Sequence, residues 1–169
     1  MKHIILVGDS VFDNRSYVNP GEPDVRKQVD GLLDAGDKVT LLAVDGSVIK
    51  GVKSQLQGLP DDATHLFLSV GGNDALNQLD IFFNPVSNIG EAFGSMNKVM
   101  RKFEKKYRKM ISLVKKYDLS TIVCTIYHPC FNHRNIERIP KYLRDVNRNE
   151  LQKMTVTALP IFNDIILQE

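Results

Sequence analysis

The sequence predicts an α/β protein whose parallel sheet is covered by helices on both faces. Four short apolar runs, at residues 3–7, 38–44, 65–70 and 119–127, alternate with segments of helical periodicity. Strand–helix–strand connections are right-handed, so few topologies remain. We favour the flavodoxin-like strand order 2-1-3-4, a three-layer α/β/α sandwich.

The first half of the chain supplies two of these strands, each followed by a helix. Residues 3–7 form a buried strand that stops at Gly8, and residues 38–44 form a second run rich in β-branched side chains. Pro23 stands where the first turn of a helix tolerates proline. After the second strand, apolar residues at helical spacing predict a helix that ends by Gly58.

The second half adds a long amphipathic helix over residues 89–117, between the strands at 65–70 and 119–127, and a last helical segment. Pro160 is expected near the start of the final part of that segment. One face of the long helix carries many Lys and Arg side chains. We interpret this face as solvated, since no aromatic residues interleave with the charges as at a nucleic-acid surface. The apolar stripe of the long helix comprises Phe93, Met96, Met100, Phe103, Tyr107, Met110, Ile111 and Val114.

Composition indicates one ordinary globular domain spanning residues 1–169. Hydrophobic residues make up 43% and charged residues 25% of the chain, and the net charge is +2. No apolar run is long enough for a membrane span, and no signal peptide is visible, so we expect a cytoplasmic protein. Cys124 and Cys130 form neither a disulfide framework nor a metal pattern, and no metal site is expected.

Three polar turns follow the first three predicted strands. The carboxyl ends of parallel strands meet at one edge, where open α/β sheets bind ligands. Acyl transfer at this edge would need a nucleophile and hydrogen-bond donors for the oxyanion. The Ser10 hydroxyl could supply the first, and the Ser10 and Gly46 N–H groups with the Asn73 amide could supply the second. Taken alone, Ser10 could equally be a polar residue that only ends a strand. Gly46 alone is more simply interpreted as a turn glycine without a role in binding.

Together these turns resemble the motif blocks of the SGNH hydrolases, also called GDSL-like lipases and esterases. The resemblance implies a flavodoxin-like sandwich without a cofactor that hydrolyses esters or related acyl compounds. It also implies that Ser10 is the nucleophile and that Gly46 and Asn73 are oxyanion donors, and we expect Asp9, Gly71 and Gly72 to border the substrate. The matching residues are Gly8-Asp9-Ser10, Gly46 and Gly71-Gly72-Asn73-Asp74.

The chain departs from this family in its last block. The family carries its general base in an Asp-x-x-His block after a fifth strand, and neither feature is found here. We therefore expect the N-terminal portion of a longer hydrolase, whose base histidine lies outside this chain. Of the histidines present, His3 and His65 begin strands at the opposite edge, and His133 falls in a loop. His128 follows the fourth strand on the correct edge, and we assign it to the substrate rim rather than to base catalysis.

The expected substrate is a small-molecule ester, either an acetylated sugar or a short-chain lipid ester. Two alternatives remain. Without a base, the chain could be an inactive fragment or a non-catalytic acyl- or carbohydrate-binding protein. It could also be a flavodoxin-like phosphate or nucleotide binder, for which the Gly71-Gly72 turn is the candidate loop. Without a fifth strand the fourth has an open edge, which predicts self-association.

Overall fold

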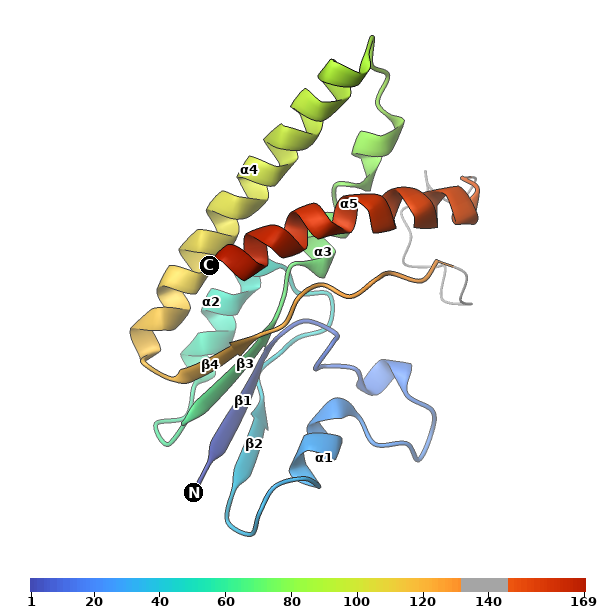
Figure 1. Cartoon of the computed structure of the whole chain (residues 1–169). Coiled ribbons are helices and arrows are strands. Elements are labelled where there is room, and N and C mark those ends of the chain that lie inside the picture. The colour runs from blue at the N-terminus through green and yellow to red at the C-terminus, as the bar shows by residue number, and fades with distance from the viewer. Residues whose placement is uncertain (132–145) are drawn as a thin grey trace.

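The computed structural model describes residues 1–131 and 146–169. Its four strands form one parallel sheet in the order β2-β1-β3-β4, which confirms the predicted topology (Figure 1). The strands are β1 (His3–Gly8), β2 (Lys38–Leu41), β3 (His65–Ser69) and β4 (Ser120–Val123). Since β1 and β3 are neighbours, the loops that leave their C-terminal ends also lie side by side.

Helices cover both faces of the sheet, unequally (Figure 1). A large core cluster packs β1 and β3 against α2, α4 and α5, whereas a smaller cluster lies under α1. The α-helices are α1 (Val25–Asp30), α2 (Val52–Gln55), α3 (Gly72–Leu76), α4 (Ile89–Val114) and α5 (Arg148–Gln168). The 3₁₀ helices are η1 (Arg15–Tyr17), η2 (Ile49–Gly51), η3 (Leu56–Gly58), η4 (Leu79–Phe83) and η5 (Lys115–Tyr117).

Two strands are shorter than the apolar runs predict. At the end of β2, the N–H groups of Leu42 and Ala43 both donate to the Leu6 carbonyl, which interrupts the regular ladder. At the end of β4, the chain leaves the sheet because Asn163 of α5 bonds both backbone groups of Ile126. Its amide accepts from the Ile126 N–H at 2.8 Å and donates to the Ile126 carbonyl at 3.0 Å.

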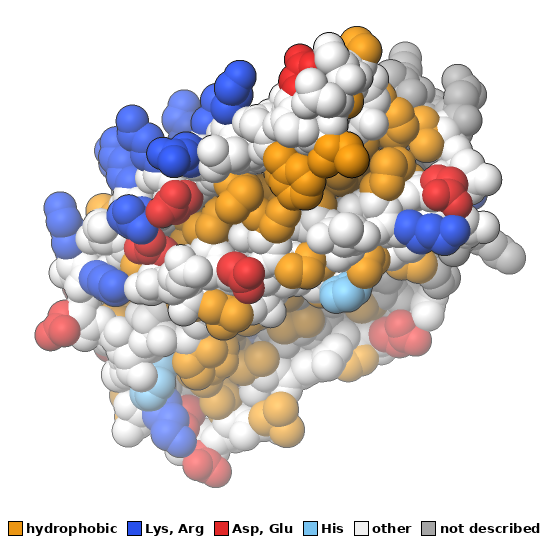
Figure 2. Space-filling view, turned by 45° about the horizontal axis from the view of Figure 1, so that its top comes forward, with side chains coloured by type: hydrophobic (Ala, Val, Ile, Leu, Met, Phe, Trp, Pro, Cys, Tyr) orange, Lys and Arg blue, Asp and Glu red, His pale blue; other side chains and the backbone are white. Residues whose placement is uncertain are grey.

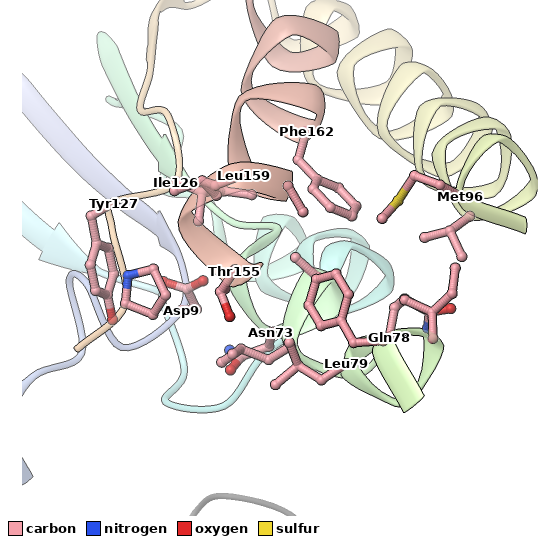
Figure 3. A pocket seen from close by; sticks show the side chains of 18 of the residues that line it. Asp9, Asn73, Gln78, Leu79, Met96, Ile126, Tyr127, Thr155, Leu159 and Phe162 are labelled. Atoms are coloured by element: carbon pink, nitrogen blue, oxygen red, sulfur yellow. The ribbon is translucent and has the colours of Figure 1, made fainter. Parts of the chain in front are cut away.

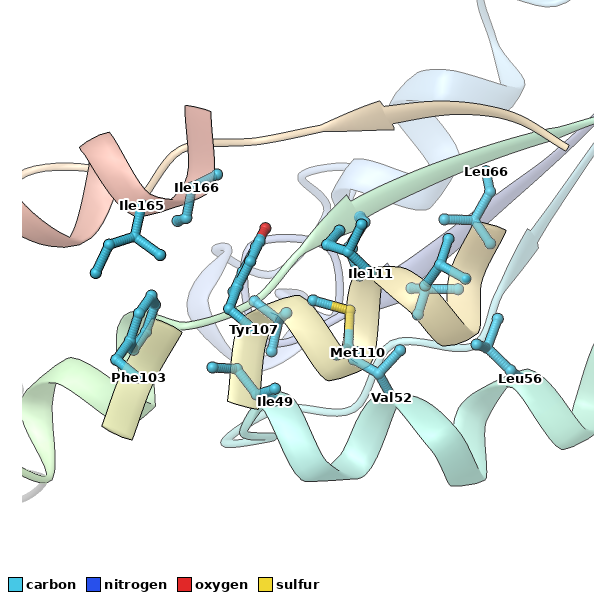
Figure 4. Packing of buried hydrophobic residues seen from close by; sticks show 14 of the residues in the cluster. Ile49, Val52, Leu56, Leu66, Phe103, Tyr107, Met110, Ile111, Ile165 and Ile166 are labelled. Carbon is cyan, nitrogen blue, oxygen red and sulfur yellow. The ribbon is translucent and has the colours of Figure 1, made fainter. Parts of the chain in front are cut away.

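The long helix α4 places the C-terminal part of its predicted apolar stripe, from Phe103 to Val114, in the core (Figure 4). The prediction is wrong for the N-terminal end of the stripe, where Phe93 is 71% exposed. Tyr107 is fully buried and extends from α4 toward Ile166 of α5. The Phe103 ring meets Phe162 of α5 edge-on, with ring centroids 5.0 Å apart. These contacts fix α5 across α4, near the edge of the sheet where the predicted site lies.

The sequence prediction for Pro160 is corrected by α5, which runs through this residue without a break. Proline removes one N–H donor from the preceding turn. The buried Leu159 and Phe162 on either side hold the turn in place through packing, and Pro160 itself is exposed. No helix among the described residues has both the length and the apolar character needed to cross a bilayer.

Candidate active site

The Ser10 turn depends on a glycine that no other residue can replace. Gly8 has a φ of 133°, and a Cβ on it would lie 1.8 Å from the Ser69 carbonyl oxygen of β3. After Gly8 the chain turns tightly, because the N–H groups of Phe12 and Asp13 both donate to the Asp9 carbonyl at 3.1 Å. The turn presents Ser10, half-buried, at the C-terminal edge of β1.

The carboxyl group of Asp9 lies under this turn and is only 5% exposed. One of its oxygens accepts a hydrogen bond from the Val11 N–H at 3.1 Å. Burial and, to a smaller extent, the negative charges of Asp45 and Asp74 raise the pKa of Asp9 to about 6. The backbone hydrogen bond opposes this shift because it favours the ionised form. Asp9 therefore shapes the turn and also borders the site as a carboxyl group that is partly protonated near pH 6.

Asn73 reaches the same edge from the turn after β3. Gly71 precedes it with a φ of 120°, and a Cβ there would lie 3.1 Å from the Phe103 ring. The Asn73 side-chain amide donates to the Ser47 carbonyl at 2.9 Å. An amide nitrogen carries two hydrogens, so this bond fixes the side chain and leaves a second N–H for another acceptor.

Gly46 belongs to the neighbouring turn after β2 and has a φ of 76°. It is exposed and does not line the pocket that contains Ser10 and Asn73. Its N–H hydrogen-bonds the carboxylate of Asp45, which lowers the pKa of that group against the larger effect of burial. The hydrogen bond between Asn73 and Ser47 links this turn to the site. The Gly46 N–H can donate to an oxyanion only after its hydrogen bond to the Asp45 carboxylate breaks.

Two buried polar residues to which the sequence analysis assigned no role hold the three turns together. Gln55 of α2 accepts from the Gly8 N–H and donates to the Gly8 carbonyl, both at 2.8 Å, and it donates to the Ser47 hydroxyl at 3.1 Å. Asp74 accepts from the Ile49 N–H at 2.7 Å, and burial raises the pKa of its carboxyl group. The available signal for Gln55 was a polar side chain between Val52 and Leu56, on the apolar face of a short helix.

Ser10 and Asn73 line one pocket, together with Asp9 and Gly72 (Figure 3). Within the pocket, the centre of a water-sized sphere can reach a volume of about 80 Å³. Asp9 and Asn73 lie toward one end and Gln78 lies toward the other, while the remaining walls are largely apolar side chains of η4, α4 and α5. The structure therefore joins a hydroxyl, an amide and an apolar cavity at the edge where open α/β sheets bind ligands.

None of the described histidines hydrogen-bonds the Ser10 hydroxyl. His3 hydrogen-bonds Asp62 at 2.6 Å, and like His65 it begins a strand at the opposite edge. His128 is exposed and does not line the pocket, although its neighbours on both sides do. Its assignment to the substrate rim stays a prediction, and His133 lies outside the described residues. Within residues 1–131 and 146–169, the Ser10 hydroxyl has no hydrogen-bond partner. The same residues contain no cluster of three or more His, Cys, Asp or Glu side chains that could hold a metal ion.

Comparison with known proteins gives structural matches only. No family model matches the sequence, and no curated protein matches it. An extracellular lipase from Streptomyces rimosus matches with a TM-score of 0.60 at 12% identity, over 99% of this chain and 75% of the lipase. Phospholipase A1 from Streptomyces albidoflavus matches with a TM-score of 0.62 at 14% identity, over 99% of this chain and 74% of that enzyme.

A third similar structure is an acetyl xylan esterase from Geobacillus stearothermophilus. It matches with a TM-score of 0.53 at 17% identity, over 99% of this chain and 72% of the esterase. Together with the strand order, these matches show that the chain has an SGNH hydrolase-like fold. At these identities the likeness establishes the fold alone.

Proposed function

We propose that the protein is a serine ester hydrolase with Ser10 as its nucleophile. The observation that supports this proposal is the pocket itself, because Ser10, at the carboxyl end of β1, and Asn73 both line it. Asn73 is fixed through Ser47 and keeps one N–H for a ligand. An oxygen that becomes negative beside Ser10 would find this donor already oriented.

In the proposed reaction the Ser10 oxygen attacks the acyl carbonyl carbon while its proton passes to a base. The carbonyl oxygen becomes an oxyanion held by Asn73 and by the Ser10 N–H, and by Gly46 once it leaves Asp45. Collapse of the intermediate breaks the ester C–O bond, releases the alcohol and leaves an acyl group on Ser10. Water then attacks this acyl group and releases the acid.

The surrounding residues have supporting roles in this proposal. Asp9 holds the Ser10 turn through the Val11 N–H, and Gly71 and Gly72 let the backbone of the next turn approach the substrate. His128 would contact the alcohol part of the ester from the rim. No described histidine contacts Ser10, so the proposal requires a proton acceptor from elsewhere, and the test must be able to supply one.

The test is hydrolysis of p-nitrophenyl butyrate with and without added imidazole as an external base. We expect Ser10→Ala to abolish the protein-dependent rate in both buffers, whereas Ser16→Ala, an exposed serine in η1, leaves it unchanged. We expect Asn73→Ala to lower kcat about 100- to 1000-fold with little change in KM, since it removes an oxyanion donor. Circular dichroism would check that each variant remains folded. Hydrolysis that survives Ser10→Ala would contradict the proposal.

A second candidate, ligand binding without turnover, is favoured by the lack of a histidine at Ser10 among the described residues. It predicts that a butyrate ester binds but releases no p-nitrophenol in either buffer. The phosphate-binding alternative has less support, because the helix that follows the Gly71-Gly72 turn is only five residues long.

A further inference from the structure

The pocket beside Ser10 is elongated and differs chemically between its two ends. Figure 3 shows Asp9 and Asn73 toward one end and Met96 of α4 at the other. Among the residues of 1–131 and 146–169 that line the pocket, Asp9 is the only charged one. Away from the sheet edge, the polar side chains that line the described part of the pocket are Gln78 and Thr155. The Gln78 amide already donates to the Asn77 carbonyl at 3.1 Å, and the Thr155 hydroxyl donates to the Leu151 carbonyl at 2.6 Å. A sugar placed there would therefore leave most of its hydroxyl groups without partners.

Separate elements build the apolar walls and hold them rigidly. Leu79 of η4 and Leu159 of α5 are each only 4% exposed, and Phe162 is 6% exposed. Phe162 is also held edge-on against Phe103, as the core packing requires. Figure 2 shows hydrophobic side chains gathered beside α4, with Lys and Arg confined to its outer flank. The cavity is thus preformed, and an apolar ligand would not need to order it.

We propose that this cavity binds a linear, medium-length acyl chain, with the carbonyl carbon at Ser10 and the methyl end at Met96. The inference rests on the proposed function and names its substrate class: esters of straight-chain fatty acids rather than acetylated sugars. Met96 then acts as the specificity-determining residue that sets how many methylene groups fit. An acetyl group would fill only the polar end and leave the apolar walls in contact with water.

The preference follows from the burial of methylene groups. Each methylene that moves from water into the cavity contributes about 0.8 kcal/mol, which corresponds to roughly a fourfold change in kcat/KM. We expect kcat/KM to rise at least tenfold from the acetyl to the octanoyl p-nitrophenyl ester, and to fall again once the chain is too long for the cavity. An ester that binds outside the cavity would show no such maximum.

The test compares wild type with Met96→Trp, which fills the far end, and Met96→Ala, which lengthens the cavity. Asn97→Trp is the matched control, because Asn97 is the exposed next residue of α4 and does not line the pocket. Across p-nitrophenyl esters of two to twelve carbons, with imidazole present, Met96→Trp should bring the octanoyl-to-acetyl ratio of kcat/KM close to one. Met96→Ala should shift the maximum to longer chains, and Asn97→Trp should retain the wild-type profile. A profile that favours acetyl, or that Met96 variants leave unmoved, would overturn the inference while leaving the hydrolase proposal intact.

A binding measurement separates failure of the inference from failure of the proposed function. Calorimetric titration with octanoate and with acetate requires no catalysis. Octanoate should bind at least tenfold more tightly than acetate to wild type and to Asn97→Trp, and Met96→Trp should remove that difference. If no ester is hydrolysed but octanoate shows this pattern, the acyl pocket stands and the hydrolase proposal fails. If octanoate binds no better than acetate, the acyl pocket is refuted whatever the hydrolysis assay shows.

Discussion

Replacing Asp9 with Asn should stabilise the fold at neutral pH far more than at acidic pH. The Asp9 carboxyl group is buried, and its pKa is raised from 3.8 to about 6. Its proton is therefore held more tightly in the folded than in the unfolded state, and stability falls as the pH rises from about 4 to about 6. An asparagine carries no charge and can still accept the hydrogen bond from the Val11 N–H.

The size of the effect follows from the two pKa values. Each pKa unit corresponds to about 1.36 kcal/mol, so ionised Asp9 costs the folded state about 3 kcal/mol once the pH is well above 6. At pH 4.5 the unfolded state is already largely ionised, and the same linkage gives a cost of about 1 kcal/mol. Asp9→Asn should therefore raise the free energy of unfolding by about 1 kcal/mol at pH 4.5 and about 3 kcal/mol at pH 7.5.

Urea denaturation followed by far-ultraviolet circular dichroism at the two pH values measures this difference. Asp61→Asn serves as the control, because Asp61 is exposed, and its effect should be the same at both pH values. If the gain in the free energy of unfolding from Asp9→Asn does not change between pH 4.5 and pH 7.5, or if it decreases, the ionised Asp9 carboxylate does not destabilise the fold and the reasoning is refuted.

Three further predictions concern packing and association. Gln55→Leu should lower the free energy of unfolding by about 2–5 kcal/mol in urea denaturation, because the Gly8 N–H and carbonyl both lose a buried partner; a loss below about 1 kcal/mol would contradict this role. Tyr107→Phe should raise the melting temperature, since the buried Tyr107 hydroxyl has no hydrogen-bond partner among the described residues; a lower melting temperature would show that the hydroxyl is satisfied. Ile122, 49% exposed on the edge strand β4, should promote self-association, and Ile122→Lys should shift sedimentation toward the monomer; identical sedimentation profiles would argue against edge pairing.

The strand order and the main helices were predictable because they follow from local patterns. Short apolar runs separated by helical periodicity allow few right-handed arrangements, and the observed order is the one that places β1 beside β3. The ends of the elements were less predictable, since they depend on distant partners. Nothing near Ile126 in the sequence indicates that Asn163, on the last helix, takes over both of its backbone hydrogen bonds.

The same distinction applies to the site. Ser10 and Asn73 could be predicted to meet, because both follow strands whose carboxyl ends share one edge, and both line the same pocket. Gln55 could not be predicted, because an isolated glutamine in a short helix has no pattern that identifies its partners. The hydrogen bond from the Gly46 N–H to the Asp45 carboxylate could not be predicted either. A turn glycine has the same sequence pattern whether or not its N–H has such an acceptor.

The central claim, that Ser10 is a nucleophile beside a prepared oxyanion site, is tested most directly by covalent labelling with diethyl p-nitrophenyl phosphate. The folded protein would be treated with and without imidazole and analysed by intact-protein and peptide mass spectrometry. We predict one diethylphosphoryl group, located on Ser10, absent from Ser10→Ala and formed much more slowly in Asn73→Ala. A label on another residue, or none in either buffer, would contradict the claim.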